Sequence, residues 1–269
     1  MLEIKNVYKT FNAGTVNQKV ALNGLDLTLE DGDVVTVIGG NGAGKSTMLN
    51  AVAGVWPVDM GKILIDGKDI TRLPEHKRAR YIGRVFQDPM MGTAATMGID
   101  ENLALARRRG EPRTLRTGIS AKERAEYREM VKELDLGLED RMTSKVGLLS
   151  GGQRQAITLL MATLKKPKLL LLDEHTAALD PATADKVLEM TRSIVTEKQI
   201  TCLMVTHNMH QALELGNRTL MMNGGRIVFD VQGEERSKMT VDDLLERFRQ
   251  SAGEELDNDR ILLSKVEKQ

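Results

Sequence analysis

The sequence predicts an α/β fold with a mostly parallel sheet, an antiparallel β subdomain and an inserted helical subdomain. A glycine-rich loop stands between an apolar run at 34–38 and a segment that can form a helix at 46–53. Apolar strands and helices alternate again after residue 167, whereas 96–166 is helical and charged without a convincing strand. Alternating strands and helices favour a parallel sheet covered by helices, and the strand-free region is expected to form a lobe of its own.

The glycine-rich loop fits the pattern G-x-x-x-x-G-K-[ST] in the strand, loop, helix context that this motif requires. Glycines let backbone N–H groups converge on phosphate oxygens, and the following helix points its positive end at the same anion. A glycine-rich turn that binds nothing is the poorer alternative. The sequence therefore predicts a nucleotide-binding protein with a P-loop NTPase core. The residues expected to contact the nucleotide are Gly39, Asn41, Gly42, Ala43, Gly44, Lys45, Ser46 and Thr47.

Composition narrows the class of protein further. The chain of 269 residues carries 38 basic and 38 acidic side chains and is 3% aromatic, which disfavours a nucleic-acid partner. No apolar stretch approaches the length of a membrane span, and the first residues lack the apolar core of a signal peptide. We therefore expect a soluble, cytosolic chain. Its one cysteine, Cys202, lies in an apolar run and is expected to be a buried, inert thiol.

The N-terminal part is expected to form strands. Segments 2–7 and 25–29 alternate apolar and polar residues, with a polar loop at 12–19 between them. A hairpin-like pair, 63–65 and Ile70, is joined by the turn signal Asp66-Gly67. Residues 80–86 are interpreted as another strand that ends before Pro89.

Helices are expected next, at 97–109 and at 121–136, the second opened by the capping box formed by Ser120 and Glu123. A basic loop separates them, and a solvated, mobile connector is the favoured interpretation over contact with lipid headgroups or an acidic partner. Its basic residues are Arg107, Arg108, Arg109, Arg113 and Arg116.

The second half begins with a helix that Ser150 can cap and Pro167 ends, with an apolar face formed by Ile157, Leu160, Met161 and Leu164. A closing hairpin turned by Gly224-Gly225 and an amphipathic tail are expected near the end, the tail packing one helix on the core before it frays. The remaining predicted elements are a strand at 168–172, a helix at 181–198, a strand at 201–205, a helix at 208–215, hairpin strands at 219–222 and 227–231, and a tail helix from 241.

Two adjacent carboxylates follow the apolar strand that ends at Leu172. In an open parallel sheet this edge is where ligands bind. Asp173 is suited to hold Mg²⁺, and Glu174 to accept a proton from an attacking water or to orient it. Two acids alone often mark only a strand entering a turn, but after a phosphate loop they are strong indicators.

With the segment Leu149-Ser150-Gly151-Gly152-Gln153, the sequence resembles the ATP-binding cassette (ABC) ATPases over residues 1–231. The family's motifs occur in the family's order: the phosphate loop at 39–47, Gln87 after a strand, this signature at 149–153, the acid pair at 173–174, Leu179-Asp180 and His207. Taken singly, His207, Gln87 and Phe11 have ordinary structural interpretations. Their common order makes independent coincidence negligible.

The resemblance implies a role for each motif. Gln87 resembles the glutamine that ligates Mg²⁺ together with Ser46 and Asp173, and His207 resembles the histidine that reads the γ-phosphate. Asp180 resembles the residue that couples two sites of a dimer. Phe11 is the candidate aromatic for stacking on adenine, with Tyr8 as a second candidate. Gly40 and His175 stand where proline is frequent and are interpreted as marks of a subfamily. The implied cofactors are ATP and Mg²⁺, and the implied catalytic set is Glu174, His207 and Gln87.

The resemblance also implies the domains and the assembly. An ATPase domain at 1–235 would comprise a core lobe, 1–87 with 167–235, and a helical subdomain at 88–166, followed by a helical tail at 236–269. Two cassettes would pair head to tail, as a homodimer or with a closely related cassette. The phosphate loop of one would then share each ATP with the signature of the other, contributed by Ser150, Gly151, Gly152 and Gln153.

The leading functional hypothesis is the ATP-hydrolysing subunit of a bacterial-type ABC importer, at the cytoplasmic face of the membrane. It would drive a separate permease, served by an extracytoplasmic substrate-binding protein, for amino-acid or other small-solute uptake. An ABC ATPase that powers export or mechanotransmission is the alternative. A soluble ABC ATPase acting on DNA or ribosomes is disfavoured, because coiled-coil heptads, a second cassette and a cysteine-rich zinc module do not occur in the sequence.

Overall fold

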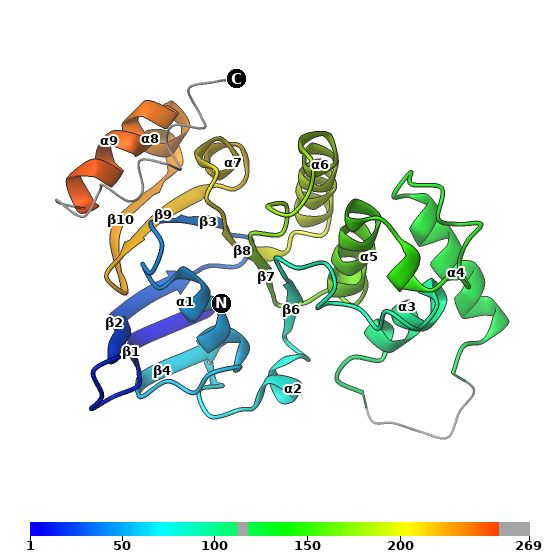
Figure 1. Cartoon of the computed structure of the whole chain (residues 1–269), viewed down its shortest axis with the longest axis horizontal. Coiled ribbons are helices and arrows are strands. Elements are labelled where there is room, and N and C mark those ends of the chain that lie inside the picture. Colours follow the sequence, from blue (N-terminus) through cyan, green and yellow to red (C-terminus); the bar gives the residue numbers. More distant parts are fainter. Residues whose placement is uncertain (112–117, 253–269) are drawn as a thin grey trace. The chain divides into compact units, whose positions relative to one another are not determined.

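The structure is a computed structural model that describes residues 1–111 and 118–252. The chain divides into two compact units, one comprising residues 1–73 with those from 203 onward and the other comprising residues 74–202. Each unit is described by itself. The expected combination of a parallel sheet, an antiparallel sheet and a helical region is confirmed (Figure 1).

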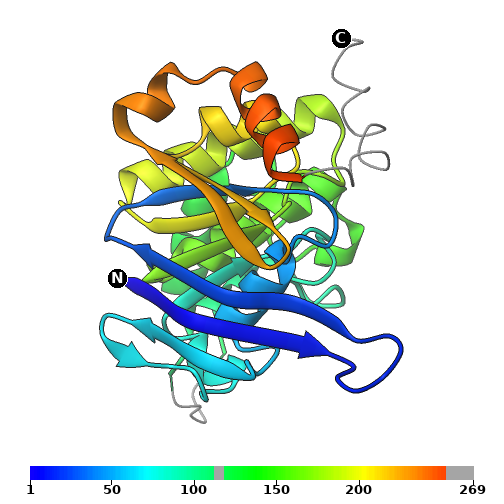
Figure 2. The ribbon, with the colours of Figure 1, turned by 90° about the vertical axis from the view of Figure 1, so that its left-hand side faces the viewer.

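The first unit contains an antiparallel sheet with the strand order β2-β1-β4-β5, whose long β1–β2 hairpin is seen in Figure 2. Its strands are β1 (Leu2–Phe11), β2 (Lys19–Leu29), β4 (Met60–Ile65) and β5 (Lys68–Asp69). Both strands of the hairpin are longer than predicted. Residues 8–11 and 19–24 pair through their backbones although their side chains do not alternate in burial. The pairing ends with Phe11 opposite Lys19.

The second sheet of this unit carries the strand that leads into the glycine loop. Strand β3 (Val34–Ile38) pairs in parallel with β9 (Arg218–Asn223), and β9 pairs with β10 (Arg226–Gln232) in an antiparallel hairpin. Strand β8 (Thr201–Val205) follows β3 in the strand order. The predicted Gly224-Gly225 turn is present, with φ angles of 54° and 76° that glycine adopts without strain.

The described part of the first unit also contains four helices: α1 (Lys45–Ala53), α7 (Met209–Glu214), α8 (Gly233–Lys238) and α9 (Val241–Ala252). Helix α9 buries Leu244 and Phe248 in a cluster with Ile38, Ala212 and Met221, as expected for the start of the tail. The continuation of that prediction, 253–269, lies outside the described residues. The sequence does not predict helix α8, because a glycine followed by five charged and polar residues gives too short a pattern.

The second unit combines a parallel pair of strands with most of the helices. Its elements are α2 (Glu75–Arg78), β6 (Ile82–Val85), α3 (Ile99–Arg107), α4 (Ala121–Lys132), the 3-10 helix η1 (Val146–Leu148), α5 (Gly151–Leu164), β7 (Leu169–Asp173) and α6 (Pro181–Glu197). Strands β6 and β7 pair in parallel. The helices α3, α4 and α5 enclose a core that includes the fully buried Ile99, Leu103, Tyr127, Val131 and Ile157.

Several predicted boundaries were wrong. The strand expected at 80–86 begins only at Ile82, because the short helix α2 and its following turn occupy the preceding residues. Helix α4 ends at Lys132 instead of 136, since Asp135 and Gly137 adopt φ angles of 52° and 63° that end a right-handed helix. Ile70 is buried but follows β5 and is not part of the paired strand.

The described arginines of the basic loop form contacts within the second unit. Arg107 pairs with Glu126 at 2.6 Å and Arg108 with Glu123 at 2.8 Å. Arg109 donates to the carbonyls of Ala162 and Lys165 near the end of α5. These three side chains are therefore held by contacts within the unit, unlike the solvated, mobile connector that the sequence favours. Arg113 and Arg116 lie outside the described residues.

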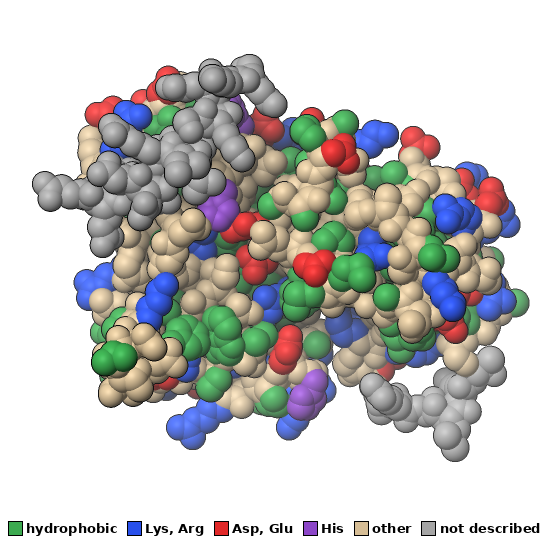
Figure 3. Space-filling model, viewed as in Figure 1, with side chains coloured by type: hydrophobic (Ala, Val, Ile, Leu, Met, Phe, Trp, Pro, Cys, Tyr) green, Lys and Arg blue, Asp and Glu red, His purple; other side chains and the backbone are tan. Residues whose placement is uncertain are grey.

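Two surface properties bear on function. Within residues 1–111 and 118–252, no helix has both the length and the apolar character needed to cross a membrane. On the face drawn in Figure 3, basic and acidic side chains are interspersed, in keeping with the balanced composition.

Candidate active site

The phosphate loop has a backbone that only glycine can supply at two of its positions. Gly39 has a φ of 151°, and a Cβ atom there would lie 2.4 Å from the carbonyl oxygen of Met222 on β9. Gly44 has a φ of 103°, and a Cβ atom would lie 2.5 Å from the carbonyl oxygen of Ala21 on β2. The loop is thus seated against two neighbouring strands, with its amide groups at the start of α1.

Lys45 and Ser46 open helix α1, as the motif predicts. The Lys45 side chain is buried, and its ammonium donates to the carbonyl oxygens of Gly39 at 2.6 Å and Gly40 at 3.0 Å. This holds a full positive charge inside the curve of the loop. Ser46 is exposed on the first turn of the helix. Backbone amides, a helix N-terminus and an ammonium together form an anion site.

The N-terminal hairpin lies beside this loop. Phe11 pairs with Lys19, and the Lys19 ammonium is 3.2 Å from the place that a Cβ of Gly42 would occupy. Phe11 is therefore one strand spacing away from a side chain that reaches the phosphate loop. Tyr8, the second candidate for adenine, packs over Gly24 instead, where its hydroxyl would be 2.9 Å from an added Cβ. The geometry favours Phe11 over Tyr8.

His207 lies on the turn that follows β8. The backbone N–H of Thr206 donates to the carbonyl of Val37, so this turn is beside the end of the strand that leads into the phosphate loop. The turn is shaped by its neighbours: the Thr206 hydroxyl bonds Gln211 and accepts from the backbone N–H of Asn208. His207 is exposed there.

In the second unit, Asp173 ends strand β7 and Glu174 follows it. Glu174 has a φ of 46°, a left-handed conformation that is uncommon for a residue other than glycine, asparagine or aspartate. Strained backbone of this kind often accompanies functional side chains. The Arg84 guanidinium lies 3.7 Å from the Asp173 carboxylate and stacks 4.4 Å from the Phe86 ring centroid. Burial lowers the pKa of Arg84, an effect that the nearby Asp173 opposes.

His175 follows the acid pair but does not join it. Its imidazole is buried, and Nε2 lies 3.0 Å from the Thr191 hydroxyl of α6. Because Thr191 donates its own proton to the Val187 carbonyl, the hydroxyl oxygen must accept from Nε2–H. Burial lowers the pKa of His175 from 6.5 to about 4. The unusual histidine of the motif is thus a neutral core residue.

Gln87 is exposed just after β6, in the same unit as the acid pair. Its strand end is held by α5, since the Gln155 side chain donates to the carbonyl of Phe86 at 3.1 Å. Helix α5 is the helix that begins with the signature. One helix therefore connects the signature to the glutamine segment within this unit.

The signature opens α5 with a capping box. The Ser150 hydroxyl accepts from the backbone N–H of Gln153, and the Gln153 side chain accepts from that of Ser150. Gly152 is buried, and a Cβ atom there would lie 2.0 Å from Cγ2 of Thr183. Asp180 in turn caps α6 by accepting from the Thr183 N–H. The signature and Leu179-Asp180 thus meet in one packed corner, on which Ser150, Gly151 and Asp180 are exposed.

The predicted residues fall into two sets. The phosphate loop, Phe11 and His207 belong to the first unit, and the acid pair, Gln87, the signature and Asp180 to the second. The donors expected for Mg²⁺ are a hydroxyl, an amide and a carboxylate oxygen, which is the oxygen chemistry that this ion prefers. Lys19 and Trp56, which lie beside the loop and beside Phe11, were missed because only the folded chain brings them there.

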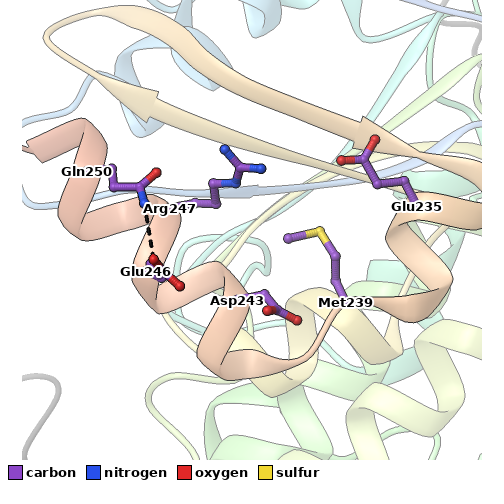
Figure 4. Close-up of a pocket in the computed structure, with 6 residues that line it drawn as sticks. All are labelled: Glu235, Met239, Asp243, Glu246, Arg247 and Gln250. Carbon is purple, nitrogen blue, oxygen red and sulfur yellow. Dashed lines mark hydrogen bonds between the residues drawn. The ribbon is translucent and has the colours of Figure 1, made fainter.

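A pocket of about 310 Å³ lies between α8 and α9 and contains none of the predicted site residues (Figure 4). Three carboxylates, one arginine, one glutamine and one methionine line it, and such a charged lining is unlike that of most small-molecule sites. The lining residues are Glu235, Met239, Asp243, Glu246, Arg247 and Gln250.

Fold and site together define an ATP-binding cassette ATPase. Residues 22–177 match the family described as ABC transporter, and the chain belongs to this family. It is 44% identical to a tyrosine transport ATP-binding protein of Clostridioides difficile, over 92% of this chain and 98% of that protein. It is 34% identical to a methionine import ATP-binding protein of Enterococcus faecalis, over 99% of this chain and 75% of that protein.

Solved structures agree with this assignment. A dimeric ATP-binding cassette in a post-hydrolysis state, bound to ADP and Pi, matches with a TM-score of 0.74 and 28% identity, over 86% of this chain and 98% of that one. A nucleotide-free cassette from an ABC transporter matches with a TM-score of 0.74 and 27% identity, over 93% and 98%. The chain is therefore an ATPase of the transporter type, as the sequence predicted.

The buried His175 predicts a pH-dependent stability. Because its folded pKa of about 4 is below the usual 6.5, the unfolded chain takes up the additional proton, and stability is lost as pH falls from 6.5 towards 4. The loss amounts to about 2 kcal/mol at pH 5. Urea unfolding at pH 7 and pH 5 should show a smaller pH effect in His175→Gln than in the wild type. The exposed His76→Gln is the matched control, and an equal pH effect in all three proteins would contradict the prediction.

Proposed function

We propose that this ATPase powers the uptake of an amino acid or a related small solute through a separate membrane permease. The observation that carries this proposal is the similarity to the tyrosine transport protein over almost the whole length of both chains. The methionine import relative favours the same direction of transport. In this assignment the chain acts at the cytoplasmic face of the membrane, and an extracytoplasmic binding protein delivers the solute.

Different residues of the chain bind the phosphates, stack on the adenine, hold Mg²⁺ and activate the attacking water. The loop amides and Lys45 bind the phosphates, and Phe11 stacks on the adenine. Ser46, Gln87 and Asp173 would hold Mg²⁺, which supplies positive charge against the phosphate oxygens. Glu174, which has a left-handed backbone, takes the proton from the attacking water. His207 contacts the γ-phosphate from the turn after β8.

The signature corner serves a second cassette. Ser150 begins a helix of fourteen residues whose first N–H groups favour an anion. The exposed edge formed by Ser150, Gly151 and Asp180 is available to another chain. The dimeric cassette among the similar structures supports such a pairing. We therefore propose that each ATP is shared between the phosphate loop of one chain and the signature of its partner.

The permease is proposed to dock on the helical region that follows Gln87. Met90 and Met91 are 51% and 66% exposed there, and Leu105 and Leu148 of the same unit are also exposed. Methionines suit an adaptable apolar interface. Because only Asp88 and Pro89 separate Gln87 from these methionines, a change at the nucleotide would reach the permease contact along a short stretch of backbone.

The role of Glu174 is tested by Glu174→Gln, which keeps the shape of the side chain and removes the base. Steady-state hydrolysis should fall by roughly 10²–10⁴ while ATP still binds. In cells that depend on this chain for transport, the loss of hydrolysis should reduce the accumulation of labelled tyrosine. If the chain powered export instead, the same variant would increase the label retained in the cells. The exposed Glu189→Gln on α6 is the control. Near-normal hydrolysis by the purified Glu174→Gln protein would refute the assignment.

The docking site is tested by thiol crosslinking, for which the chain is well suited. Its one cysteine is buried, and burial raises the pKa of Cys202 to about 12, so an introduced surface thiol reacts alone. Met91→Cys should crosslink to a cytoplasmic loop of the permease in membranes that contain both proteins. Asp242→Cys, exposed on α9, should not. Crosslinks formed only by the α9 thiol would place the permease elsewhere.

A further inference from the structure

Trp56, the single tryptophan of the chain, packs against Phe11. The ring centroids are 4.8 Å apart and the ring planes meet at 80°, an edge-to-face arrangement. Both side chains are half-buried, so neither belongs to a closed hydrophobic core. Edge-to-face pairs at this distance are favourable and restrict the orientation of both rings.

The loop that carries Trp56 directly follows helix α1, the helix that begins at the phosphate loop. Helix α1 ends at Ala53 and is capped by Gly54, whose φ of 85° turns the chain, and Trp56 follows two residues after this cap. The N–H groups of Gly54 and Val55 both donate to the Asn50 carbonyl and close the end of the helix. One short helix thus begins with Lys45 and ends beside Trp56.

Asp59 fixes the other end of this loop to β1. Its carboxylate accepts from the backbone N–H of Thr10 at 2.6 Å and from the Lys9 ammonium at 3.0 Å. Its own N–H donates to the Tyr8 carbonyl at 2.9 Å. Partial burial raises the pKa of Asp59, but the bonds from Thr10 and Lys9 lower it more. The carboxylate therefore stays ionised and holds the loop.

The Lys9 ammonium also lies close to the Phe11 ring. It lies 5.5 Å from the centroid of the ring while it is bonded to Asp59. Phe11 is thereby contacted by Trp56 and by a fixed cation, and its backbone pairs with Lys19, whose ammonium is near Gly42. A phenylalanine ring that rotates freely would lose conformational entropy when it stacks on a base. Because these contacts already restrict the Phe11 ring, the entropy cost of binding is smaller.

We propose that Trp56 is a positioning residue for the nucleobase, which orients Phe11 for stacking, with Asp59 holding the loop that presents it. This inference rests on the proposed role of Phe11 in binding adenine. Trp56 contributes to the affinity for a base-bearing nucleotide and leaves the phosphate contacts of α1 unchanged. It therefore acts on the binding of ATP and not on the rate of hydrolysis at saturation.

The test compares ATP with inorganic tripolyphosphate, which has the phosphates but no base. Calorimetric titrations of the full-length chain should show ATP bound roughly three- to ten-fold more weakly by Trp56→Ala, with tripolyphosphate unaffected. Trp56→Phe should restore most of the loss, and Asp59→Ala should reproduce it with both rings still present. The neighbouring Val55→Ala, at a residue that is 39% exposed, is the control. The value of kcat at saturating ATP should stay within about twofold while KM rises.

The variant Phe11→Ala distinguishes a failure of the proposed adenine contact of Phe11 from a failure of the proposed positioning role of Trp56. If Phe11→Ala and Trp56→Ala weaken ATP binding alike and the double variant is no worse, the two rings act as one unit. If Phe11→Ala weakens ATP binding and Trp56→Ala behaves like Val55→Ala, the inference is overturned and the role of Phe11 stands. If Phe11→Ala has no effect, the proposed adenine contact fails and the inference fails with it. Equal weakening of ATP and tripolyphosphate would show that Trp56 acts on the phosphate loop, which also overturns it.

Discussion

The glycine backbone of the phosphate loop is the constraint on which the first unit depends. At Gly39 and Gly44 the neighbouring strands approach so closely that a single Cβ atom would meet a carbonyl oxygen at about 2.5 Å or less. The loop is therefore fixed by β9 and β2, and the turn after β9 braces it further through the bond from the Gly225 N–H to the Ala43 carbonyl. Hairpin, sheet and α1 position one another at this loop, and the anion site follows from their packing.

A second close approach organises the other unit. Gly152 admits the Thr183 methyl group where any side chain would collide, so the start of α5 packs tightly against the start of α6. Both helix starts are capped by side chains, Ser150 and Asp180. Their exposed edges suit an anion and a protein partner. The same helix, through Gln155, holds the strand that leads to Gln87. The proposed partner contact and the proposed nucleotide sensor would therefore both depend on α5.

The sequence was sufficient for the features that are local in the chain. The phosphate loop, the acid pair after an apolar strand and the capping box at Ser150 each lie within a few residues, so pattern and spacing predict them. Contacts between distant segments have no such pattern, and Trp56 on Phe11, Lys19 near Gly42 and Thr183 at Gly152 were not foreseen. Elements as short as α2 and α8 carry too few residues to show a period.

Each active site is proposed to be shared between two chains, and tethered dimers test this sharing most directly. One tether joins a Lys45→Ala chain to a Ser150→Arg chain, and the other joins a wild-type chain to one carrying both substitutions. The two tethered dimers carry the same number of substitutions. If the site is shared, the first tethered dimer keeps one intact pair of phosphate loop and signature, and the second tethered dimer keeps none. Hydrolysis by the first alone is the predicted result, and sustained hydrolysis by the second would contradict the account.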